Sequence, residues 1–417
     1  MRKADLKVKA AQTDLMTRQS KGGYVRFVLV LGALGAFGPL SMDMYLPSLP
    51  SLTRDLQTTT SLAQLSITAC LIGLAAGQLI LGPLSDKFGR KIPLLSGLIL
   101  FTLTSFLCAI TTSIGLLVIL RLIQGIAGAA GMVISRAIAR DLYSGSKLTK
   151  FFSMLMAVNG IFPILAPILG GFVLRFTSWH GVFVVLCVIG FLLFLSALFY
   201  IPETLPVEKR ISGGLGTTMS AMGHIFRDSR FVGYALVLGL VMGAMFCYIS
   251  ASSFVLQDMF DVSPQGFSLF FATNGLGIVL MSQLAGLLAG RVDARKIMRT
   301  GIVIAAIGSI ALFASLMLEP PRLVAIMIPL FLVVSMVGLV NSTAFSLAMQ
   351  SQAKAAGSAS AILGLGMNTI GALFSPLVGL GGSHTYFPMA LMILFCDVGA
   401  LVVYVLFIRK KALKIVK

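Results

Sequence analysis

The chain contains twelve long apolar stretches, and this succession restricts its possible folds more than any other feature. An α-helix needs roughly 20 apolar residues to cross the hydrocarbon core of a bilayer, and backbone polar groups must be hydrogen-bonded internally there. With 57% hydrophobic and 11% charged residues, the composition excludes a soluble globular class. The sequence predicts an all-α polytopic membrane protein with spans at 26–47, 61–82, 92–112, 114–135, 150–174, 180–201, 231–254, 267–289, 298–318, 322–347, 356–380 and 386–408.

The basic residues lie almost entirely on one side of the predicted membrane. With a cytoplasmic N-terminus, all but four of the 32 Lys and Arg residues fall in cytoplasmic segments. The exceptions are Arg54, Arg175 and Arg322 in outer loops, and Arg121 within a helix. This pattern follows the positive-inside rule, so we expect both termini in the cytoplasm. It also explains the net charge of +18 without a nucleic-acid partner.

The longest polar connection, residues 202–230, divides the spans into six plus six. We therefore expect a cytoplasmic tail at 1–25, a six-helix bundle at 26–201, a cytoplasmic loop at 202–230, a second six-helix bundle at 231–408 and a basic cytoplasmic tail at 409–417. Equal halves are typical of transporters built by duplication, with the substrate site where the halves meet. The internal symmetry is weak: residues 82–91 have only a loose echo at residues 290–296.

Asp43 lies near the end of the first span, between Pro39 and Pro47. A carboxylate at membrane depth costs about 2.5–3.5 kcal/mol on insertion scales, so such residues usually mark functional sites. Pro47 has no N–H to offer the carbonyl group of Asp43, which predicts a frayed backbone at this point. Such backbone is tolerated where it is buried in protein or lines a cavity. The alternative is that Asp43 only caps or orients the helix end.

Arg121 is the charged residue of the fourth span. It shares one helix face with Gln124 and with the small or flexible residues Gly125, Gly128 and Met132. The predicted topology places Arg121 at a depth similar to that of Asp43. An Arg–carboxylate pair is a favourable way to keep both charges in the membrane, so we expect the two side chains to pair. That pair is either part of a proton-coupling site or a static structural contact.

The loop between the second and third spans carries the pattern G-x-x-x-D-x-x-G-R-K. Its glycines allow a tight turn, and Asp86 lies four residues before Arg90, so the two can form a charge pair. The alternative is ordinary positive-inside loop charge. The residues that we assign to this cytoplasmic gate motif are Gly82, Asp86, Gly89, Arg90 and Lys91.

Two further features lie within the spans. In the fifth span the prolines and glycines Pro163, Pro167, Gly170 and Gly171 predict a bent, closely packed helix, and Asn159 belongs to the same motif. Asp397 lies near the middle of the twelfth span without an evident partner. It is either a second proton-coupling residue or a structural carboxyl that burial keeps neutral.

Several classes of function find no support in the sequence. The three histidines, His180, His224 and His384, lie at helix ends or in loops, and no zinc-protease or phosphate-binding motif is present. The five cysteines all lie in apolar spans and form no C-x-x-C pair, which indicates packing residues. We expect no metal site, no ATP use and no enzymatic activity.

Taken together, these motifs resemble the major facilitator superfamily, in particular its twelve-helix drug/proton antiporters. Within these the chain is most similar to the Bcr/CflA group, which is related to bicyclomycin-resistance and chloramphenicol-efflux proteins. The resemblance covers residues 25–408 and rests on segments 41–50, 82–91, 121–130, 140–141 and 202–205, with weaker matches at 271–274 and 356–360. The fifth span departs from the pattern, since Phe162 and Ala166 stand where the group usually has glycine.

The resemblance implies two six-helix bundles around a central cavity lined by the first, fourth, seventh and tenth helices. It also implies that Asp43 takes and releases a proton, that Arg121 tunes it, and that residues 86–91 latch the cytoplasmic side. We expect the pair of Asp43 and Arg121 to loosen in one state, because a permanently paired carboxylate could not carry a proton. Met and aromatic residues suit a promiscuous pocket, so we assign Met42, Tyr45, Gln124, Met242, Phe246 and Tyr248 to the substrate cavity; plain helix packing is the alternative for all but Gln124.

The predicted function is proton-coupled efflux of drugs or drug-like small molecules by a monomer in the bacterial cytoplasmic membrane. The proton gradient is the energy source, and no cofactor is expected. The alternative is an exporter of one endogenous metabolite such as an amino acid, followed by a proton symporter for uptake. A channel or a membrane enzyme is a different class, and measurable turnover with a proton gradient but without chemical change would separate these classes from a transporter.

Overall fold

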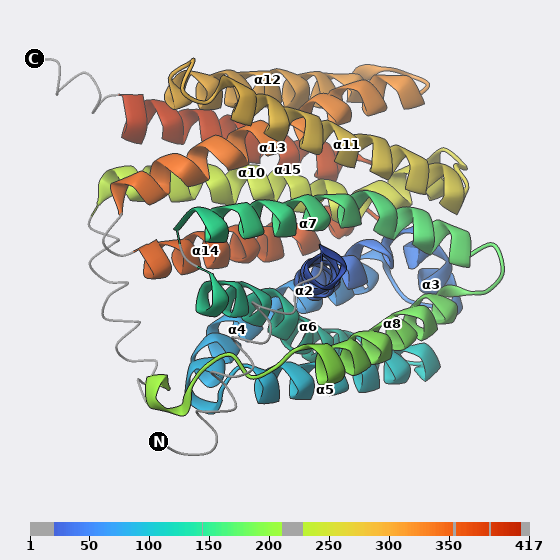
Figure 1. Ribbon diagram of the computed structural model, residues 1–417. Coiled ribbons are helices and arrows are strands. Elements are labelled where there is room, and N and C mark those ends of the chain that lie inside the picture. The colour runs from blue at the N-terminus through green and yellow to red at the C-terminus, as the bar shows by residue number, and fades with distance from the viewer. Residues whose placement is uncertain (1–20, 144, 211–227, 353–355, 383–384, 410–417) are drawn as a thin grey trace, which may run out of the picture. The chain divides into compact units, whose positions relative to one another are not determined.

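The computed structural model describes residues 21–143, 145–210, 228–352, 356–382 and 385–409. Their regular structure is helical, with a single isolated bridge between Ala289 and Val292, which confirms the all-α fold class. Figure 1 shows the helices in chain order: α2 (Lys21–Asp43), α3 (Leu49–Asp55), α4 (Thr60–Phe88), α5 (Lys91–Ile110), α6 (Ile114–Leu142), α7 (Gly145–Val173), α8 (Trp179–Tyr200), α10 (Ser229–Phe254), α11 (Pro264–Leu288), α12 (Ala294–Ala314), α13 (Leu323–Ser351), α14 (Ala356–Val378) and α15 (Phe387–Val403).

The helices reproduce the predicted spans. In the described part of the chain, eleven are long and apolar enough to cross a membrane. The remaining predicted span, the fifth at 150–174, corresponds to α7, which runs from Gly145 to Val173. Several helices are extended by a short helical turn, such as the π-helical turn Val255–Met259 that follows α10.

Local chemistry fixes several helix ends in the second half of the chain. Asp228, Ser263 and Asp293 are N-cap residues of α10, α11 and α12, and each side chain accepts a hydrogen bond from a backbone N–H of the first turn. Pro264 follows its cap at the first helical position, where a missing N–H is harmless. These caps explain why the helices begin a few residues before the predicted apolar spans.

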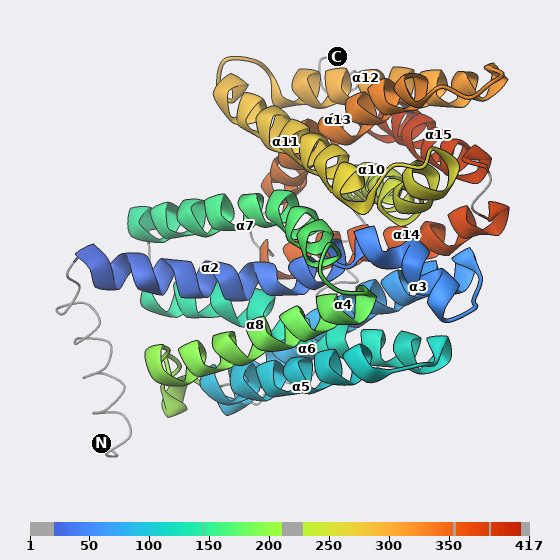
Figure 2. The same cartoon turned by 90° about the vertical axis from the view of Figure 1, so that its right-hand side faces the viewer.

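The described residues form two compact units. The first comprises residues 21–45 and 72–210, and the second comprises residues 46–71 and 228–409. In the first unit α2 packs on α6 and α7, and α5 packs on α6 and α8; Figure 2 shows α5 and α8 side by side. In the second unit α10 packs on α13, α14 and α15, while α13 also packs on α11 and α12.

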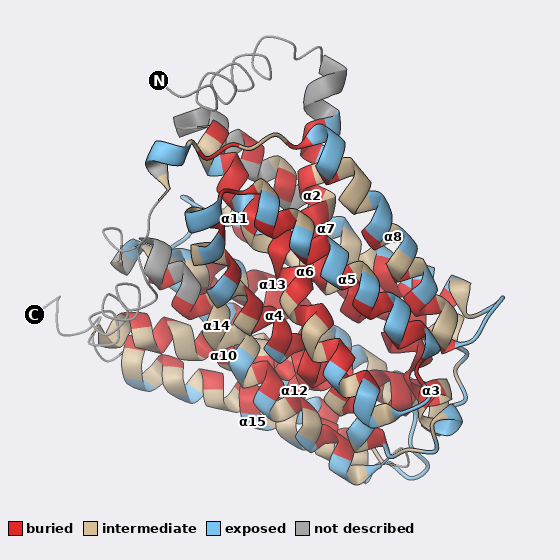
Figure 3. Cartoon of the chain, turned by 90° about the horizontal axis from the view of Figure 1, so that it is seen from below, coloured by how far each residue is buried: buried red, intermediate tan, exposed pale blue. Residues whose placement is uncertain are grey.

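Large apolar side chains remain exposed along the outer helices. On α5 and α8 the exposed positions include Leu103, Phe106, Phe191 and Leu192, each more than half exposed, and Figure 3 shows exposed and buried residues alternating along these helices. Contiguous apolar exposure on this scale is unusual for a water-soluble monomer. It is expected for helix faces in contact with lipid.

Residues 46–71 pack on α10 within the second unit. The Ser253 hydroxyl donates to the carbonyl oxygen of Leu46 at 2.7 Å, and the Gln257 amide donates to that of Pro47 at 3.0 Å. The Gln64 amide donates to the carbonyl oxygen of Ser250 at 3.1 Å. All three acceptors are backbone carbonyl groups, so the contact depends on the position of the backbone rather than on particular side chains of the acceptor residues.

Gly379, which follows α14, packs closely against the start of α4. A Cβ atom at Gly379 would lie 2.5 Å from Oε1 of Gln64 and 2.9 Å from Cα of Ser61. The first neighbour is a flexible side-chain end, but the second is backbone and cannot move cheaply. A side chain at residue 379 would therefore act as a wedge between α4 and α14.

We predict that Gly379→Ala destabilises the protein by about 1–3 kcal/mol, the usual range for overpacking. The matched control is Gly366→Ala on α14, where a Cβ atom would meet nothing within 4 Å. Thermal unfolding of the purified protein in detergent measures both. Equal melting temperatures for the two variants would show that the close packing at Gly379 is not required.

Candidate functional site

The candidate transport site is built around the point where α2 ends. Asp43 is the last residue of α2, and it is 7% exposed. Met44 and Tyr45 form a turn, and a short 3-10 helix follows at Leu46–Ser48. The sequence predicted only a frayed backbone, whereas the structure shows an interrupted helix. Pro47 explains the break, because it cannot donate the hydrogen bond that would continue the helix past Asp43.

Helix α7 makes a backbone-to-backbone contact at the same break. A Cβ atom at Gly170 would clash with the carbonyl oxygen of Met44, so the glycine permits an approach that no side chain would allow. Pro167 and Gly171 of the predicted motif are also buried. The side chains of Asn159 and Pro163 lie outside the described residues.

Arg121 is fully buried on α6, at 0% exposure. Its Nη1 donates to Oε1 of Gln124 at 2.5 Å and to the carbonyl oxygen of Ser41 at 3.3 Å. Gln124 donates in turn to the hydroxyl of Ser105 on α5 at 2.7 Å. The contact with Ser41 places the guanidinium beside α2, at a residue two positions before Asp43. This position agrees with the similar depth that the sequence predicts for the two charged residues.

The expected ion pair between Asp43 and Arg121 is not formed. Among the described residues, no carboxylate lies within salt-bridge distance of Arg121. Its charge faces neutral oxygens and two aromatic rings instead, since the guanidinium carbon lies 5.0 Å from the ring centroid of Tyr45 and 5.7 Å from that of Phe183. We expected this pair to loosen in one state, and in this structure carbonyl oxygens and aromatic rings, which the sequence did not reveal as partners, surround the guanidinium instead.

The residues assigned to the substrate cavity fall into two groups, one in each unit. Met42, Tyr45 and Gln124 are buried in the first unit. In the second, Met242 is partly buried, and the ring of Phe246 occupies the space that a side chain at Gly371 would need, which is a packing role.

Tyr248 has a polar partner as well as a packing role. Its ring stacks on that of Phe271, with centroids 5.5 Å apart, and its hydroxyl accepts a hydrogen bond of 2.7 Å from the amide of Asn274. Phe271 and Asn274 both belong to the segment 271–274 that carried a weaker resemblance. The contact shows that this segment faces α10.

Asp397 is buried on α15, at 1% exposure. Its Oδ2 atom has no hydrogen-bond partner among the described residues, and no cation within salt-bridge distance is found there. This geometry is compatible with both roles that the sequence left open.

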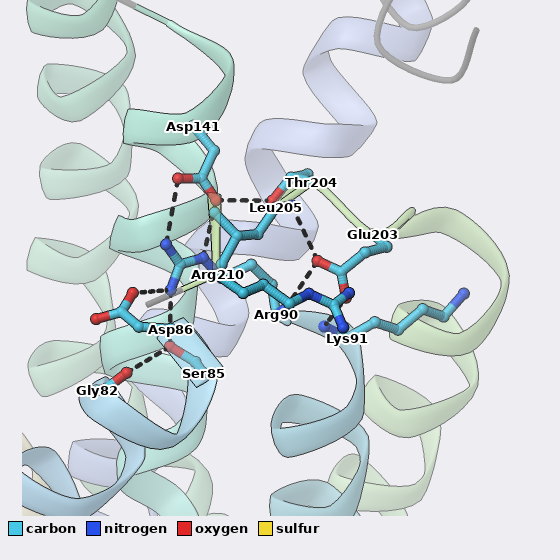
Figure 4. Close-up of polar contacts among 10 residues, drawn as sticks. All are labelled: Gly82, Ser85, Asp86, Arg90, Lys91, Asp141, Glu203, Thr204, Leu205 and Arg210. Atoms are coloured by element: carbon cyan, nitrogen blue, oxygen red, sulfur yellow. Dashed lines mark hydrogen bonds and ion pairs between the residues drawn. The ribbon is translucent and has the colours of Figure 1, made fainter. Parts of the chain in front are cut away.

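The cytoplasmic gate motif is organised by Arg90. Its side chain donates from Nε and Nη2 to the two carboxylate oxygens of Asp141, at 2.8 and 3.3 Å, and from Nη1 to Asp86 at 2.5 Å (Figure 4). Nη1 also lies 2.9 Å from the hydroxyl of Ser85. The predicted pair of Asp86 and Arg90 is therefore present, and Asp141 from the end of α6 adds a second carboxylate that the spacing did not reveal.

The electrostatic balance at Arg90 favours its charged form. Burial lowers the pKa of Arg90, but hydrogen bonds and charge interactions with Asp141 and Asp86 outweigh it and leave the pKa above its ordinary value. The Asp141 side chain is 16% exposed and that of Asp86 is 51% exposed. The bidentate, less exposed contact with Asp141 is therefore the stronger of the two.

Glu203, just after α8, joins the same motif through the backbone. Its carboxylate accepts hydrogen bonds from the N–H groups of Arg90 at 2.9 Å and Lys91 at 3.3 Å, at the start of α5 (Figure 4). A carboxylate is favourable at the positive end of a helix. Gly89 makes the approach possible, because its φ is +90° and a Cβ atom there would clash with Glu203.

Two further bonds strengthen these contacts, one to Asp141 at the end of α6 and one to the backbone of α8. The Thr204 hydroxyl donates to Oδ2 of Asp141 at 3.0 Å, and Nζ of Lys91 donates to the carbonyl oxygen of Leu198 at 2.8 Å. Segments 82–91, 140–141 and 202–205, which the sequence presents as separate matches, thus form one network. In contrast, a Cβ atom at Gly82 would make only an ordinary contact, 3.8 Å from a side-chain carbon of Val133, so close packing does not explain a glycine there.

The described residues contain no group of three or more His, Cys, Asp or Glu side chains that could hold a metal ion. Ionisable side chains such as Arg121, Asp43 and Asp397, which are buried within long apolar helices, usually mark functional sites in membrane proteins. A family model described as Major Facilitator Superfamily matches residues 31–412, and the chain belongs to that family.

Relatives of known sequence narrow the group. The chain is 44% identical, over 89% of its length and 93% of the relative, to an uncharacterised MFS-type transporter, YdgK, of Bacillus subtilis. It is 30% identical to a bicyclomycin resistance protein homolog of Haemophilus influenzae, covering 93% of this chain and 96% of the relative. A chloramphenicol resistance protein of Pseudomonas aeruginosa is 28% identical, covering 87% and 86%. These names support membership of a drug-efflux group within the family.

Solved structures support the same fold. The xylose transporter XylE of E. coli, in a partially occluded inward-open conformation, matches with a TM-score of 0.72 at 17% identity, covering 93% of this chain and 98% of that one. The nucleoside transporter NupG matches with a TM-score of 0.72 at 17% identity, covering 92% and 98%. At this level of identity the likeness concerns the fold.

We predict that Asp141→Asn lowers the free energy of unfolding by about 1–3 kcal/mol, because it leaves a buried guanidinium without its bidentate partner. Asp86→Asn is the matched comparison and should cost no more than about 1 kcal/mol, as expected for an exposed ion pair. Thermal unfolding in detergent measures both variants. A larger loss for Asp86→Asn would show that Asp141 is not the stronger partner of Arg90.

Proposed function

We propose that the protein is a proton-coupled exporter that exchanges an inward-moving proton for an outward-moving drug or drug-like molecule. The observation that carries the proposal is the position of Asp43, a buried carboxyl at the end of the interrupted helix α2. Arg121 binds the carbonyl oxygen of Ser41 on the same helix, and no carboxylate among the described residues forms a salt bridge with it. A buried carboxyl that no salt bridge holds in its charged form can bind and release a proton as its surroundings change.

In this mechanism Asp43 carries the proton and Arg121 influences how readily it is bound. The substrate competes with the proton in the region of Asp43, against Met42, Tyr45 and Gln124 of the first unit. The network of Arg90, Asp86 and Asp141 holds the cytoplasmic side in one conformation and releases it in another. Asp397 is a candidate for a second proton site. The proton gradient supplies the energy, and no cofactor takes part.

The second candidate function is export of a specific endogenous metabolite such as an amino acid. The fold supports both functions equally. Two of the relatives are named for resistance to bicyclomycin or chloramphenicol, and a third group carries the name multidrug resistance protein MdtL, which favours the drug exporter. Uptake by proton symport is less favoured for the same reason.

The proposed setting is the bacterial cytoplasmic membrane, with both termini in the cytoplasm and the protein acting as a monomer. The distribution of Lys and Arg supports this orientation. It also places the network at Arg90 on the cytoplasmic side and the break after Asp43 towards the outer side.

A susceptibility panel in an efflux-deficient host tests the proposed function. Expression of the protein should raise resistance to some of the compounds, and inverted vesicles should accumulate those compounds only when a pH gradient is imposed. Transport that is indifferent to the gradient would contradict proton coupling. Resistance to none of the compounds, with amino-acid export present, would favour the second function.

We predict that Asp43→Asn lowers the rate of gradient-driven transport at least tenfold, because an amide cannot carry the proton. The variant protein should still reach the membrane. The matched control is Asp261→Asn, at an exposed loop residue with a φ of +52° that asparagine tolerates. Transport in vesicles with and without a pH gradient is the measurement. Unchanged transport by Asp43→Asn would remove Asp43 from the mechanism.

A further inference from the structure

The buried charge of Arg121 has no anionic partner among the described residues to compensate it. Its hydrogen-bond acceptors are the neutral Oε1 of Gln124 and the neutral carbonyl oxygen of Ser41. Its Nε and Nη2 atoms make no hydrogen bond to the described residues, and both are shielded from solvent. Burying a guanidinium without a counter-ion costs free energy. The groups that contact the two faces of the guanidinium must therefore supply the stabilisation.

Two aromatic rings provide that contact. The guanidinium carbon lies 5.0 Å from the ring centroid of Tyr45 and 5.7 Å from that of Phe183, within the range of cation–π attraction, which strengthens when the groups are desolvated. The two rings lie 5.2 Å apart, and Trp179 packs edge-on against Phe183 at 6.1 Å. All three aromatic residues are buried, so the arrangement is enclosed by protein.

The arrangement depends on the break in α2. Tyr45 lies in the turn two residues after Asp43, and its ring reaches Arg121 because the helix has already ended. Phe183 comes from α8, far from Tyr45 in the sequence. The break therefore positions two groups: the ring of Tyr45, which lies against Arg121, and the carboxyl group of Asp43 at the end of α2.

We propose that Tyr45 and Phe183 form an aromatic seat that holds the guanidinium of Arg121 away from the carboxyl of Asp43. In this role Phe183 is a positioning residue: it touches neither proton nor substrate and acts through Arg121. The seat substitutes for a counter-ion, so Asp43 is not required to neutralise the arginine. This inference rests on the proposed role of Asp43 in proton transfer.

The alternative is that both rings only fill space. A double-mutant cycle with Asp43→Asn and Arg121→Gln separates the two possibilities in the purified full chain. In the wild-type background the losses in melting temperature should add, because the two side chains are not paired. In a Phe183→Leu background they should fail to add, because the released guanidinium then pairs with Asp43.

A second variant covers the case in which Phe183→Leu does not fold. Replacing Phe183 by trifluorophenylalanine keeps the shape of the ring and weakens its attraction for a cation. The same non-additivity should appear, and the pH at which vesicle exchange is half-maximal should move from its wild-type value. Trifluorophenylalanine at Phe231, which is fully buried in the core of the second unit, is the matched control and should change neither quantity.

Two results would overturn the seat. One is additivity in every background, which shows that the rings do not restrain Arg121. The other is strong coupling between Asp43 and Arg121 in the wild type, which shows that they are paired already. A wild-type protein without gradient-driven transport would instead refute the proposed function, while the melting-temperature cycle would still decide whether the seat exists.

Discussion

The interruption of the first membrane helix after Asp43 is the constraint on which the arrangement of the first unit depends. A continuous helix would carry Tyr45 around its axis and cover the backbone of Met44 with side chains. Because the helix stops, the carbonyl group of Met44 is open to the approach of Gly170, and Tyr45 faces Arg121. Irregular backbone at membrane depth persists only where protein surrounds it. Residues 42–49, which include the break, are all buried.

At the ends of α4, α6 and α8, around Arg90, the same unit relies on charge rather than on a break. The side chain of Arg90 binds two carboxylates from two different helices, Asp86 and Asp141. The carboxylate of Glu203 accepts a hydrogen bond from the backbone N–H of Arg90. Each of these bonds involves an ionised group, and such bonds are roughly twice as strong as neutral ones. They also require particular geometry, since Gly89 must take a left-handed φ for Glu203 to reach the helix end. Three segments that are distant in the sequence are thereby joined by ionised groups.

Periodicity and length were sufficient to predict the helices, because a lipid environment leaves few alternatives for an apolar stretch of this length. The span expected at 114–135 is helical from Ile114, and only its polar C-terminal extension to Leu142 was missed. The predictions failed where partners come from distant segments. Nothing in the spacing of Arg121 points to Phe183, and nothing near residue 90 points to Glu203. Ser105, which binds Gln124, was missed for the same reason, as a lone serine in an apolar helix gives no signal.

The second unit shows that the cytoplasmic network is not a general property of the repeated fold. Its loop at residues 290–296 repeats the left-handed glycine, with a φ of +79° at Gly290. However, Asp293 caps α12, where it accepts from the N–H of Arg295 at 2.8 Å. Asp228 caps α10 and accepts at 2.8 Å from the neutral amide of Gln352 rather than from a guanidinium. Among the described residues, therefore, the ion pairs between an arginine and a carboxylate at these helix ends belong to the first unit. The loose sequence echo between the halves thus reflects a shared left-handed glycine, whereas among the described residues of these two loops the pairing of an arginine with two carboxylates is found at Arg90.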